Sequence, residues 1–321
     1  MEGKNGKTKV FKWAAVLMLA AMVLFTGCPN AAGGNSGGSN TPAVSTDKTY
    51  TVGGISFTMK GIAAVTNKSI GHTDNASDNG PHPVSLSAYL IGETEVTQDL
   101  WQAVMGSNPS HFSGSPEGSE VQGKRPVENV SWYHAIAFCN KLSLKLGLTP
   151  CYTVTVSGSP IDFETLAYSD IPTSDSTDWN NTVLDMTKNG FRLPTEAEWE
   201  WAAKGGTTDK WAGTNTESEL GTYAWYNANS NNKTHEVKKR TANGYGLYDM
   251  SGNVAEWCWD RYSSTTPTGG QDPTGAASGT RRVMRGGSWK YFANSAARAY
   301  RGRDDPGSRD FILGLRVACR P

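Results

Sequence analysis

The sequence predicts a loop-rich α+β fold, and three observations lead to this expectation. The chain holds 36 glycines among 321 residues, above the share of about 7% found in average proteins. It also holds 11 Trp, 12 Tyr and 9 Phe, which favours loops packed around aromatic side chains over a helical bundle. Strand-like runs with a period of two occur beside a few short, capped helical stretches. The formal net charge is zero, so overall charge indicates no polyanionic partner.

The first residues have the pattern of an export signal. Four lysines precede an apolar run at 13–25, and Thr26 and Gly27 lead to Cys28. The run is too short to cross a bilayer comfortably, and the order of charged, apolar and small residues is typical of a signal peptide. Because it resembles a bacterial lipoprotein signal, we expect residues 1–28 to be the signal and Cys28 to carry the lipid. An ordinary signal with an incidental cysteine is the alternative.

A flexible tether is expected at residues 29–49, which are rich in Gly, Ser and Asn. Such a composition cannot form a packed core. It would hold the domain away from a membrane, so we expect lipid-anchored display at the bacterial cell surface, on the outer membrane.

Strand signals open the domain, which is expected to span residues 50–321. Residues 50–59 predict one strand, and residues 84–97 predict a strand or hairpin edge. Residues 151–189 are polar and irregular and are expected to be an insertion. The apolar run at the chain's end, FILGLRVA, predicts a closing strand.

Three helices are expected, each after an N-cap residue: Thr97, Ser131 and Thr195. The second is expected to run from 132 to 146. The third begins with a capping box, because Glu198 follows Thr195 by three residues. Its acidic residues could suggest acid–base chemistry, but at a helix N-terminus they more simply complement the helix dipole.

A glycine- and aromatic-rich run at 243–262 contains oxygen ligands. Asp249, Glu256 and nearby loop carbonyls could hold Ca²⁺, which prefers oxygen donors. Alternatively, Glu256 ties the loop together by hydrogen bonds. No cysteine and histidine spacing resembles a zinc site, and no phosphate loop or nucleophile motif is present.

The last stretch, residues 285–320, is long, irregular and aromatic. Loops longer than about 15 residues are usually functional or disordered, and five aromatic residues argue against disorder. We therefore expect a binding surface here. Residues 281–321 hold nine Arg and one Lys against three Asp. Arginines that brace loops through hydrogen bonds explain this excess better than a nucleic-acid site does.

Five ordered motifs resemble the sulfatase-modifying-factor family, the formylglycine-generating-enzyme branch of the C-type lectin fold. They are ETEVTQDLWQAVMG, RPVENVSWYHAIAFCNKLS, FRLPTEAEWEWAAKGG, NGYGLYDMSGNVAEWCWD and RVMRGGSW with LGLRVACR. The resemblance implies one loop-rich α+β domain with that fold. The family's calcium motif would place ligands at Asp249, Glu256 and the carbonyls of Gly252 and Val254.

The resemblance also bears on catalysis. The oxygen-dependent enzymes of the family bind copper through two cysteines that follow the GGS motif. Those places fall on Tyr291 and Ala296 in this chain, and neither side chain supplies a thiolate. We therefore expect no enzyme activity and no required cofactor, with structural calcium as the one metal considered. The alternatives are a formylglycine-generating-type enzyme with a reorganised site and a purely structural lipoprotein.

A closer resemblance is to the variable proteins of diversity-generating retroelements, including treponemal surface lipoproteins. It implies a monomeric binding protein for an unknown protein or surface ligand, with nucleic acid disfavoured. A fixed frame of Trp289, Arg298, Arg301, Pro306, Arg309 and Arg316 would carry exchangeable positions. Exchangeable side chains must point outward, since buried ones would create cavities or overpacking. The expected variable, ligand-binding positions are Tyr291, Phe292, Asn294, Ser295, Tyr300, Gly302, Arg303, Asp304, Asp305, Gly307, Ser308, Asp310, Phe311 and Ile312.

Overall fold

The computed structural model describes residues 46–321 except 115 and 117. The expected signal at 1–28, with Cys28, and the tether up to residue 45 lie outside the described residues. Within the described part of the chain, no helix is both long and apolar enough to cross a bilayer. The first strand begins at Lys48, inside the range expected to be tether.

The first sheet joins both ends of the domain. Its strand order is β1-β2-β5-β15, and every neighbouring pair is antiparallel. The expected single strand at 50–59 is instead a hairpin, because Gly53 and Gly54 have positive φ angles of 57° and 80° and turn the chain. The strands are β1 (Lys48–Val52), β2 (Ile55–Ile62), β5 (Tyr89–Gly92) and β15 (Ala318–Cys319).

The second sheet takes three of its four strands from the C-terminal part of the chain. Its order is β13-β12-β10-β14; β14 runs parallel to β10, and the other pairs are antiparallel. The closing run FILGLRVA therefore supplies two short strands to two sheets rather than one strand. The strands here are β10 (Ala255–Arg261), β12 (Arg282–Arg285), β13 (Gly302–Asp304) and β14 (Leu313–Leu315).

Smaller sheets complete the strand structure. The order β11-β4-β3 forms a three-stranded sheet, while β6 pairs with β9 and β7 with β8 inside the expected insertion. The bounds are β3 (Val65–Ile70), β4 (His82–Leu86), β6 (Tyr152–Thr153), β7 (Thr155–Val156), β8 (Ser159–Pro160), β9 (Val183–Leu184) and β11 (Gly270–Gln271).

The three expected helices are confirmed with their caps. They are α2 (Gln98–Met105), α3 (Trp132–Lys145) and α5 (Glu196–Lys204), and the side chains of Thr97, Ser131 and Thr195 accept from the backbone amides that follow them. The capping box of α5 is complete. The short helices are α1 (Ala76–Asn79), α4 (Thr177–Asn180) and α6 (Leu220–Tyr223), and the 3₁₀ turns are η1 (Thr73–Asn75), η2 (Gln122–Lys124), η3 (Tyr168–Asp170), η4 (Glu217–Glu219) and η5 (Ala293–Ala296).

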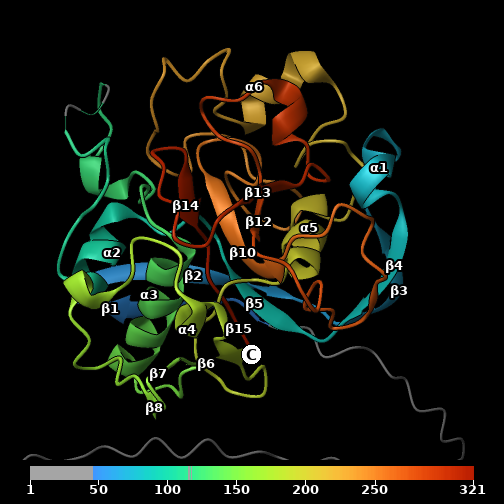
Figure 1. Cartoon of the computed structure of the whole chain (residues 1–321). Coiled ribbons are helices and arrows are strands. Elements are labelled where there is room, and N and C mark those ends of the chain that lie inside the picture. The colour runs from blue at the N-terminus through green and yellow to red at the C-terminus, as the bar shows by residue number, and fades with distance from the viewer. Residues whose placement is uncertain (1–45, 115, 117) are drawn as a thin grey trace, which may run out of the picture. The chain divides into compact units, whose positions relative to one another are not determined.

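The core lies between these layers. Helices α2 and α3 pack together beside the β1-β2 hairpin, and α5 lies against the β10-β12 sheet (Figure 1). Trp101, Trp132 and Trp257 are fully buried in the first core cluster, and Trp199 of α5 is fully buried in a second. The α+β class expected from the sequence is confirmed, and α5 is placed directly beneath the C-terminal stretch.

Candidate ligand-binding face

Exposed aromatic side chains mark the C-terminal stretch. Phe292 is 75% exposed and Tyr300 38% exposed, and they are the exposed aromatic residues of the described chain. Both lie in the loops between β12 and β13, next to η5. Large apolar groups left in water in one short stretch are typical of an interaction surface.

Most of the other expected variable positions are also accessible. Three are exposed and seven are partly exposed, whereas the residues between them that are buried include Ala293, Ala296, Ala297, Arg298, Ala299 and Arg301. We name the accessible positions the variable face: Tyr291, Phe292, Asn294, Ser295, Tyr300, Gly302, Arg303, Asp304, Asp305, Ser308, Asp310 and Phe311.

Two expected variable positions are buried instead. Ile312 is 6% exposed and belongs to the main core. Gly307 is also buried, and a Cβ there would lie 2.7 Å from the carbonyl carbon of Ser174, so the backbone leaves no room for a side chain. Conversely, Arg309 was expected in the frame but is exposed.

Residues from outside the stretch extend the variable face. Phe311 stacks on Trp289 with ring centroids 5.8 Å apart, and Phe112 meets both rings edge-on. His111 lies 5.4 Å from the Phe311 ring. Sequence reasoning missed His111 and Phe112, because they lie far away in the chain and no local pattern singles them out.

Three buried arginines, Arg285, Arg298 and Arg301, form ion pairs with α5. Arg285 donates to Glu196 at 2.5 Å and to Glu200 at 2.7 Å. Arg301 holds Glu196 with two hydrogen bonds of 2.6 and 2.9 Å, and Arg298 donates to Glu200 at 2.9 Å. These glutamates were expected to complement the helix dipole; their main contacts are with arginines of the C-terminal stretch.

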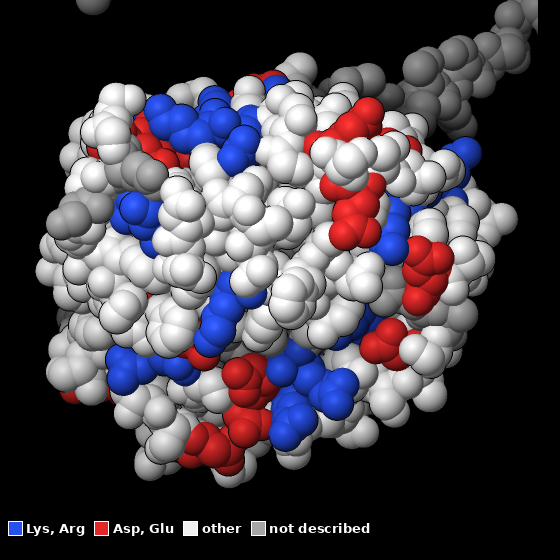
Figure 2. Space-filling view, turned by 90° about the horizontal axis from the view of Figure 1, so that it is seen from above, with Lys and Arg blue, Asp and Glu red and all other residues white. Residues whose placement is uncertain are grey.

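The charge pattern at the surface is mixed. The face seen from above in Figure 2 is mainly uncharged, and its basic and acidic residues form small groups, several of which adjoin a group of opposite sign. Because Arg285, Arg298 and Arg301 are buried, the arginine excess of the C-terminal stretch belongs largely to the interior. This agrees with the expectation that arginine braces loops here.

Comparison with known proteins identifies the family. The family model described as "Sulfatase-modifying factor enzyme 1-like domain" matches residues 39–321. The chain belongs to this family. The solved structure of Treponema denticola variable protein 1 is 64% identical, covers 88% of this chain and 100% of its own chain, and has a TM-score of 0.84. The resemblance to treponemal variable proteins and the fold of the formylglycine-generating-enzyme branch are thereby confirmed.

Two curated relatives show how widely the family extends. The protein named Chaperone protein LppX from Paenibacillus barcinonensis is 36% identical over 325 residues, covering 95% of this chain and 98% of the relative. The formylglycine-generating enzyme of Thermomonospora curvata is 36% identical over 169 residues, or 44% of this chain. The match spans 54% of that enzyme's length.

The calcium motif implied by the family does not fit a cation here. Both carboxylate oxygens of Glu256 accept hydrogen bonds: Arg316 binds the pair at 2.8 and 3.0 Å, and the Trp199 indole donates at 2.6 Å. Asp249 accepts from the Lys238 amide at 3.0 Å, and its other oxygen is buried without a partner. A guanidinium thus supplies the positive charge beside Glu256, so this carboxylate is not free to bind a cation. Glu256 instead ties the loop by hydrogen bonds, which was the alternative.

The cysteines of the described chain have no features of reactive thiols. Cys139, Cys151, Cys258 and Cys319 are all free and buried. Burial raises the pKa of each thiol, to about 12 for Cys319. Since the thiolate is the nucleophile and metal ligand, buried thiols of this kind behave as small apolar side chains.

Proposed function

We propose that this protein is a non-enzymatic binding protein whose variable face is diversified by a retroelement. One observation carries the proposal: within a single stretch, accessible side chains alternate with buried ones that anchor it. A substitution at an accessible position changes contacts with a ligand at little cost to folding. A substitution at a buried position would create a cavity or leave a buried charge unpaired.

The composition of the variable face suits recognition of a protein or another surface ligand. Tyr and Phe provide large contact area at low conformational-entropy cost, and Ser, Asn and Asp provide adaptable hydrogen bonds. Tyr291, Phe292 and Tyr300 are the aromatic anchors we propose. The ligand's identity would change with the sequence of the face, while the frame stays constant.

Genomic DNA tests the diversification directly. We expect a near-copy of the segment that encodes residues 285–320, differing at the variable-face positions, beside a gene for a reverse transcriptase. Sequencing the locus decides this, and a locus with neither feature would contradict the proposal.

A triple substitution tests the role of the aromatic anchors. Tyr291→Ala, Phe292→Ala and Tyr300→Ala together should leave a cooperative unfolding transition within a few degrees of wild type. Trp289→Ala is the matched control, because Trp289 is 5% exposed and packs in the core; it should cost about 3–5 kcal/mol. If the triple variant loses as much stability as the control, the aromatic residues pack rather than bind.

We further propose that the chain is anchored at the bacterial cell surface, on the outer membrane, through lipid on Cys28 and acts as a monomer. The lysine-rich start, the short apolar run and the tether support this. Metabolic labelling with a radioactive fatty acid should mark wild type and not Cys28→Ser. Protease added to intact cells should degrade the wild-type domain.

An enzyme of the formylglycine-generating type is the competing function. Tyr291 and Ala296 stand where those enzymes carry copper-binding cysteines, and the four described cysteines are buried. With copper and oxygen supplied, a peptide substrate of those enzymes should therefore show no conversion of its cysteine. Conversion above the rate of a boiled sample would overturn the non-enzymatic assignment.

A further inference from the structure

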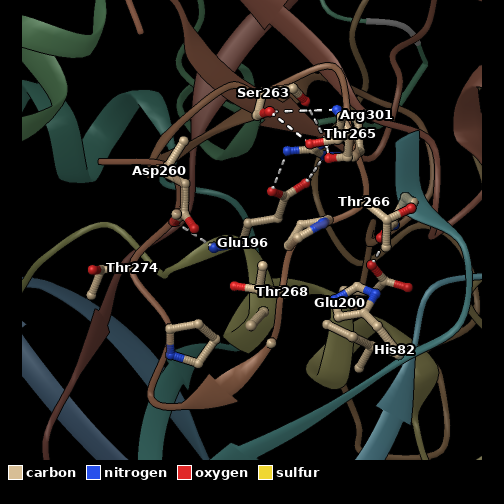
Figure 3. A pocket seen from close by; sticks show the side chains of 18 of the residues that line it. His82, Glu196, Glu200, Asp260, Ser263, Thr265, Thr266, Thr268, Thr274 and Arg301 are labelled. Atoms are coloured by element: carbon tan, nitrogen blue, oxygen red, sulfur yellow. Dashed lines mark hydrogen bonds and ion pairs between the residues drawn. The ribbon is translucent and has the colours of Figure 1, made fainter. Parts of the chain in front are cut away.

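We propose that a second binding site, independent of the variable face, takes a small neutral ligand with several hydroxyl groups, such as a polyol or a single sugar. The site is a cavity of about 290 Å³ between α5, the end of β10 and the loops at 263–269 and 273–276. Figure 3 shows part of its lining, with the carboxyl group of Asp260 beside the amide of Glu196 and labelled threonines distributed around them. None of the residues that line it except Arg301 belongs to the stretch at 285–320.

A buried carboxyl group forms the deepest polar part of the cavity. Asp260 is 3% exposed, and its Oδ2 accepts from the amide of Glu196 at 2.7 Å. No described residue donates to Oδ1. Gly275 makes room for this carboxyl group, because a Cβ there would lie 2.6 Å from the Asp260 Cβ and 2.9 Å from Oδ1. The loop is therefore shaped around Asp260 and leaves one of its oxygens available.

Hydroxyl groups and one histidine supply further polar partners. Ser263, Thr265, Thr266, Thr268 and Thr274 line the cavity. Thr266 accepts from the amide of Gly80 at 3.0 Å, and the side chains of Thr268 and Thr274 have no protein hydrogen bond among the described residues. The His82 Nδ1 bonds the carbonyl of Gly80 at 2.8 Å. Because that nitrogen must donate, Nε2 is left as an acceptor.

Most charged groups around the cavity are already engaged by protein partners, which favours a neutral ligand over an ionic one. Glu196 is held by Arg285 and Arg301, and Glu200 by Arg285 and Arg298. Burial raises the pKa of Asp260 to about 8, and the charge of Glu196 acts in the same direction. The raised pKa favours the neutral acid, which can donate a hydrogen bond. Arg261, which also lines the cavity, donates to the carbonyls of Asn180 and Ala277 at 2.9 and 3.4 Å, so both lining arginines already have protein acceptors.

Size and shape narrow the ligand further. Small-molecule sites usually have volumes of about 300–1,000 Å³, so this cavity is at the lower end and suits one ring. Its polar groups are mixed donors and acceptors spread around an otherwise apolar lining of Ile70, Ala197 and two prolines. A ring with hydroxyl groups at its edge and C–H bonds on its faces matches this arrangement.

Arg301 fixes the outer wall of the site. Its Nη1 donates to the carbonyls of Ser263, Thr265 and Asp78 at 2.8, 3.3 and 2.9 Å. The loop around the opening is thus tied to the same arginine that binds Glu196 in the floor. The cavity is held open by contacts that do not depend on a ligand.

The test is direct binding by the purified full chain. Saturation-transfer NMR and calorimetry would be run with D-glucose, D-galactose, N-acetyl-D-glucosamine and myo-inositol. We expect at least one of them to bind, and Thr268→Trp, which fills the opening, to weaken binding at least tenfold. Ser278→Trp is the matched control, since Ser278 is exposed near the same loop and does not line the cavity.

The outcomes separate clearly. Absence of binding by all four compounds overturns the proposal, as does binding that Thr268→Trp leaves unchanged or that Ser278→Trp weakens equally. If Thr268→Trp fails to fold, Thr274→Trp replaces it, because Thr274 is also an exposed residue that lines the cavity. None of these results depends on whether the variable face binds a partner.

Discussion

Buried ion pairs are the most consequential single-residue features of this protein. Glu256 and Arg316 are both fully buried and joined at 2.8 Å. Burying charges is costly, and removing one partner leaves the other uncompensated in a medium of low dielectric constant. Such pairs add less net stability than their geometry suggests, but they tolerate substitution poorly.

We predict that Glu256→Gln destabilises the fold by about 3 kcal/mol, because the buried Arg316 then loses the carboxylate that binds it directly. Denaturant unfolding at pH 7 measures the loss. Asp47→Asn is the control, since the Asp47 pair with Lys60 is largely accessible and should cost less than about 1 kcal/mol. If both variants lose the same free energy of unfolding, burial of the ion pair does not determine how much its removal destabilises the protein.

Calcium should have no effect on stability. The guanidinium of Arg316 occupies the Glu256 carboxylate, so the family's calcium ligands are not available together. We expect the same melting temperature in EDTA and in millimolar Ca²⁺, as measured by calorimetry. A calcium-dependent rise of several degrees would mean that Arg316 gives way to the ion.

Glu128 should make stability depend on pH. It is fully buried, with one oxygen accepting from the Phe112 amide at 2.8 Å and the other without a partner. Burial raises its pKa to about 7, and the charge of Asp310 acts in the same direction. Because the pKa of Glu128 is higher in the folded than in the unfolded protein, protonation of Glu128 stabilises the fold. This stability is fully present below the pKa of the unfolded chain and is lost as pH rises through about 7.

The test compares wild type with Glu128→Gln at pH 5 and pH 8. From pH 5 to pH 8, the free energy of unfolding of wild type should fall by about 2 kcal/mol more than that of the variant. The reason is that the Gln side chain does not ionise. Unfolding free energies from urea titrations measure this difference. A constant difference at both pH values would show that Glu128 does not titrate in this range.

Helix α5 links the core to the variable face. Its N-terminal turn is closed by the capping box of Thr195 and Glu198, while Glu196 and Glu200 hold Arg285, Arg298 and Arg301 of the C-terminal stretch. The position of the face therefore depends on where this one helix begins.

Thr195→Ala should cost about 1 kcal/mol, the usual loss for an N-cap. The Oγ1 that accepts from the Glu198 amide at 3.2 Å is removed. Thermal unfolding measures the loss, and Thr195→Ser, which keeps the hydroxyl group, should restore most of it. A Ser variant as unstable as Ala would assign the cost to the lost methyl group.

Helices were more predictable than strands because their signals are local. The caps at Thr97, Ser131 and Thr195 lie within three residues of the amides they bind. Strand partners are distant: β15 pairs with β5, and β14 with β10. Nothing within FILGLRVA shows that it serves two sheets, and the hairpin at Gly53 depends on a turn rather than on a period.

Similar reasoning explains the errors in the candidate site. The accessible positions followed from the resemblance of the C-terminal stretch to variable proteins. The burial of Ile312 and Gly307 depends on packing against the core and on the distant backbone of Ser174. The joining of His111 and Phe112 to Phe311 also depends on tertiary structure alone.

At the scale of the whole molecule, the buried glutamates should govern acid stability. Burial alone would raise the pKa of Glu200, but Arg285, Arg298 and Asn79 outweigh it and lower the pKa below its usual value. His235 and Arg125 do the same for Glu120. Because these pKa values are lower in the folded protein, the ionised glutamates stabilise the fold. This stability is present above the pKa of about 4.5 of the unfolded chain and is lost as pH falls below it.

We therefore expect the unfolding free energy to fall steeply between about pH 4.5 and pH 3. Far-ultraviolet circular dichroism with urea at several pH values measures it. The Glu200→Gln variant should be less stable than wild type at pH 7. Its unfolding free energy should also fall less steeply as the pH is lowered. If the variant's unfolding free energy falls with pH as steeply as that of wild type, other carboxyl groups cause the loss of stability in acid.

The buried frame arginines have a consequence for the gene. Under the proposed function, mutation in the C-terminal stretch is confined to adenines in the template, and residues 286–321 contain no Glu, Gln or Met. Arginine has four codons that begin with cytosine and two that begin with adenine. Arg298, Arg301 and Arg316 should all use the cytosine class, which shields the first two bases from this mutagenesis. The chain would thus protect its ion pairs by the choice of synonymous codons, before selection acts on any protein.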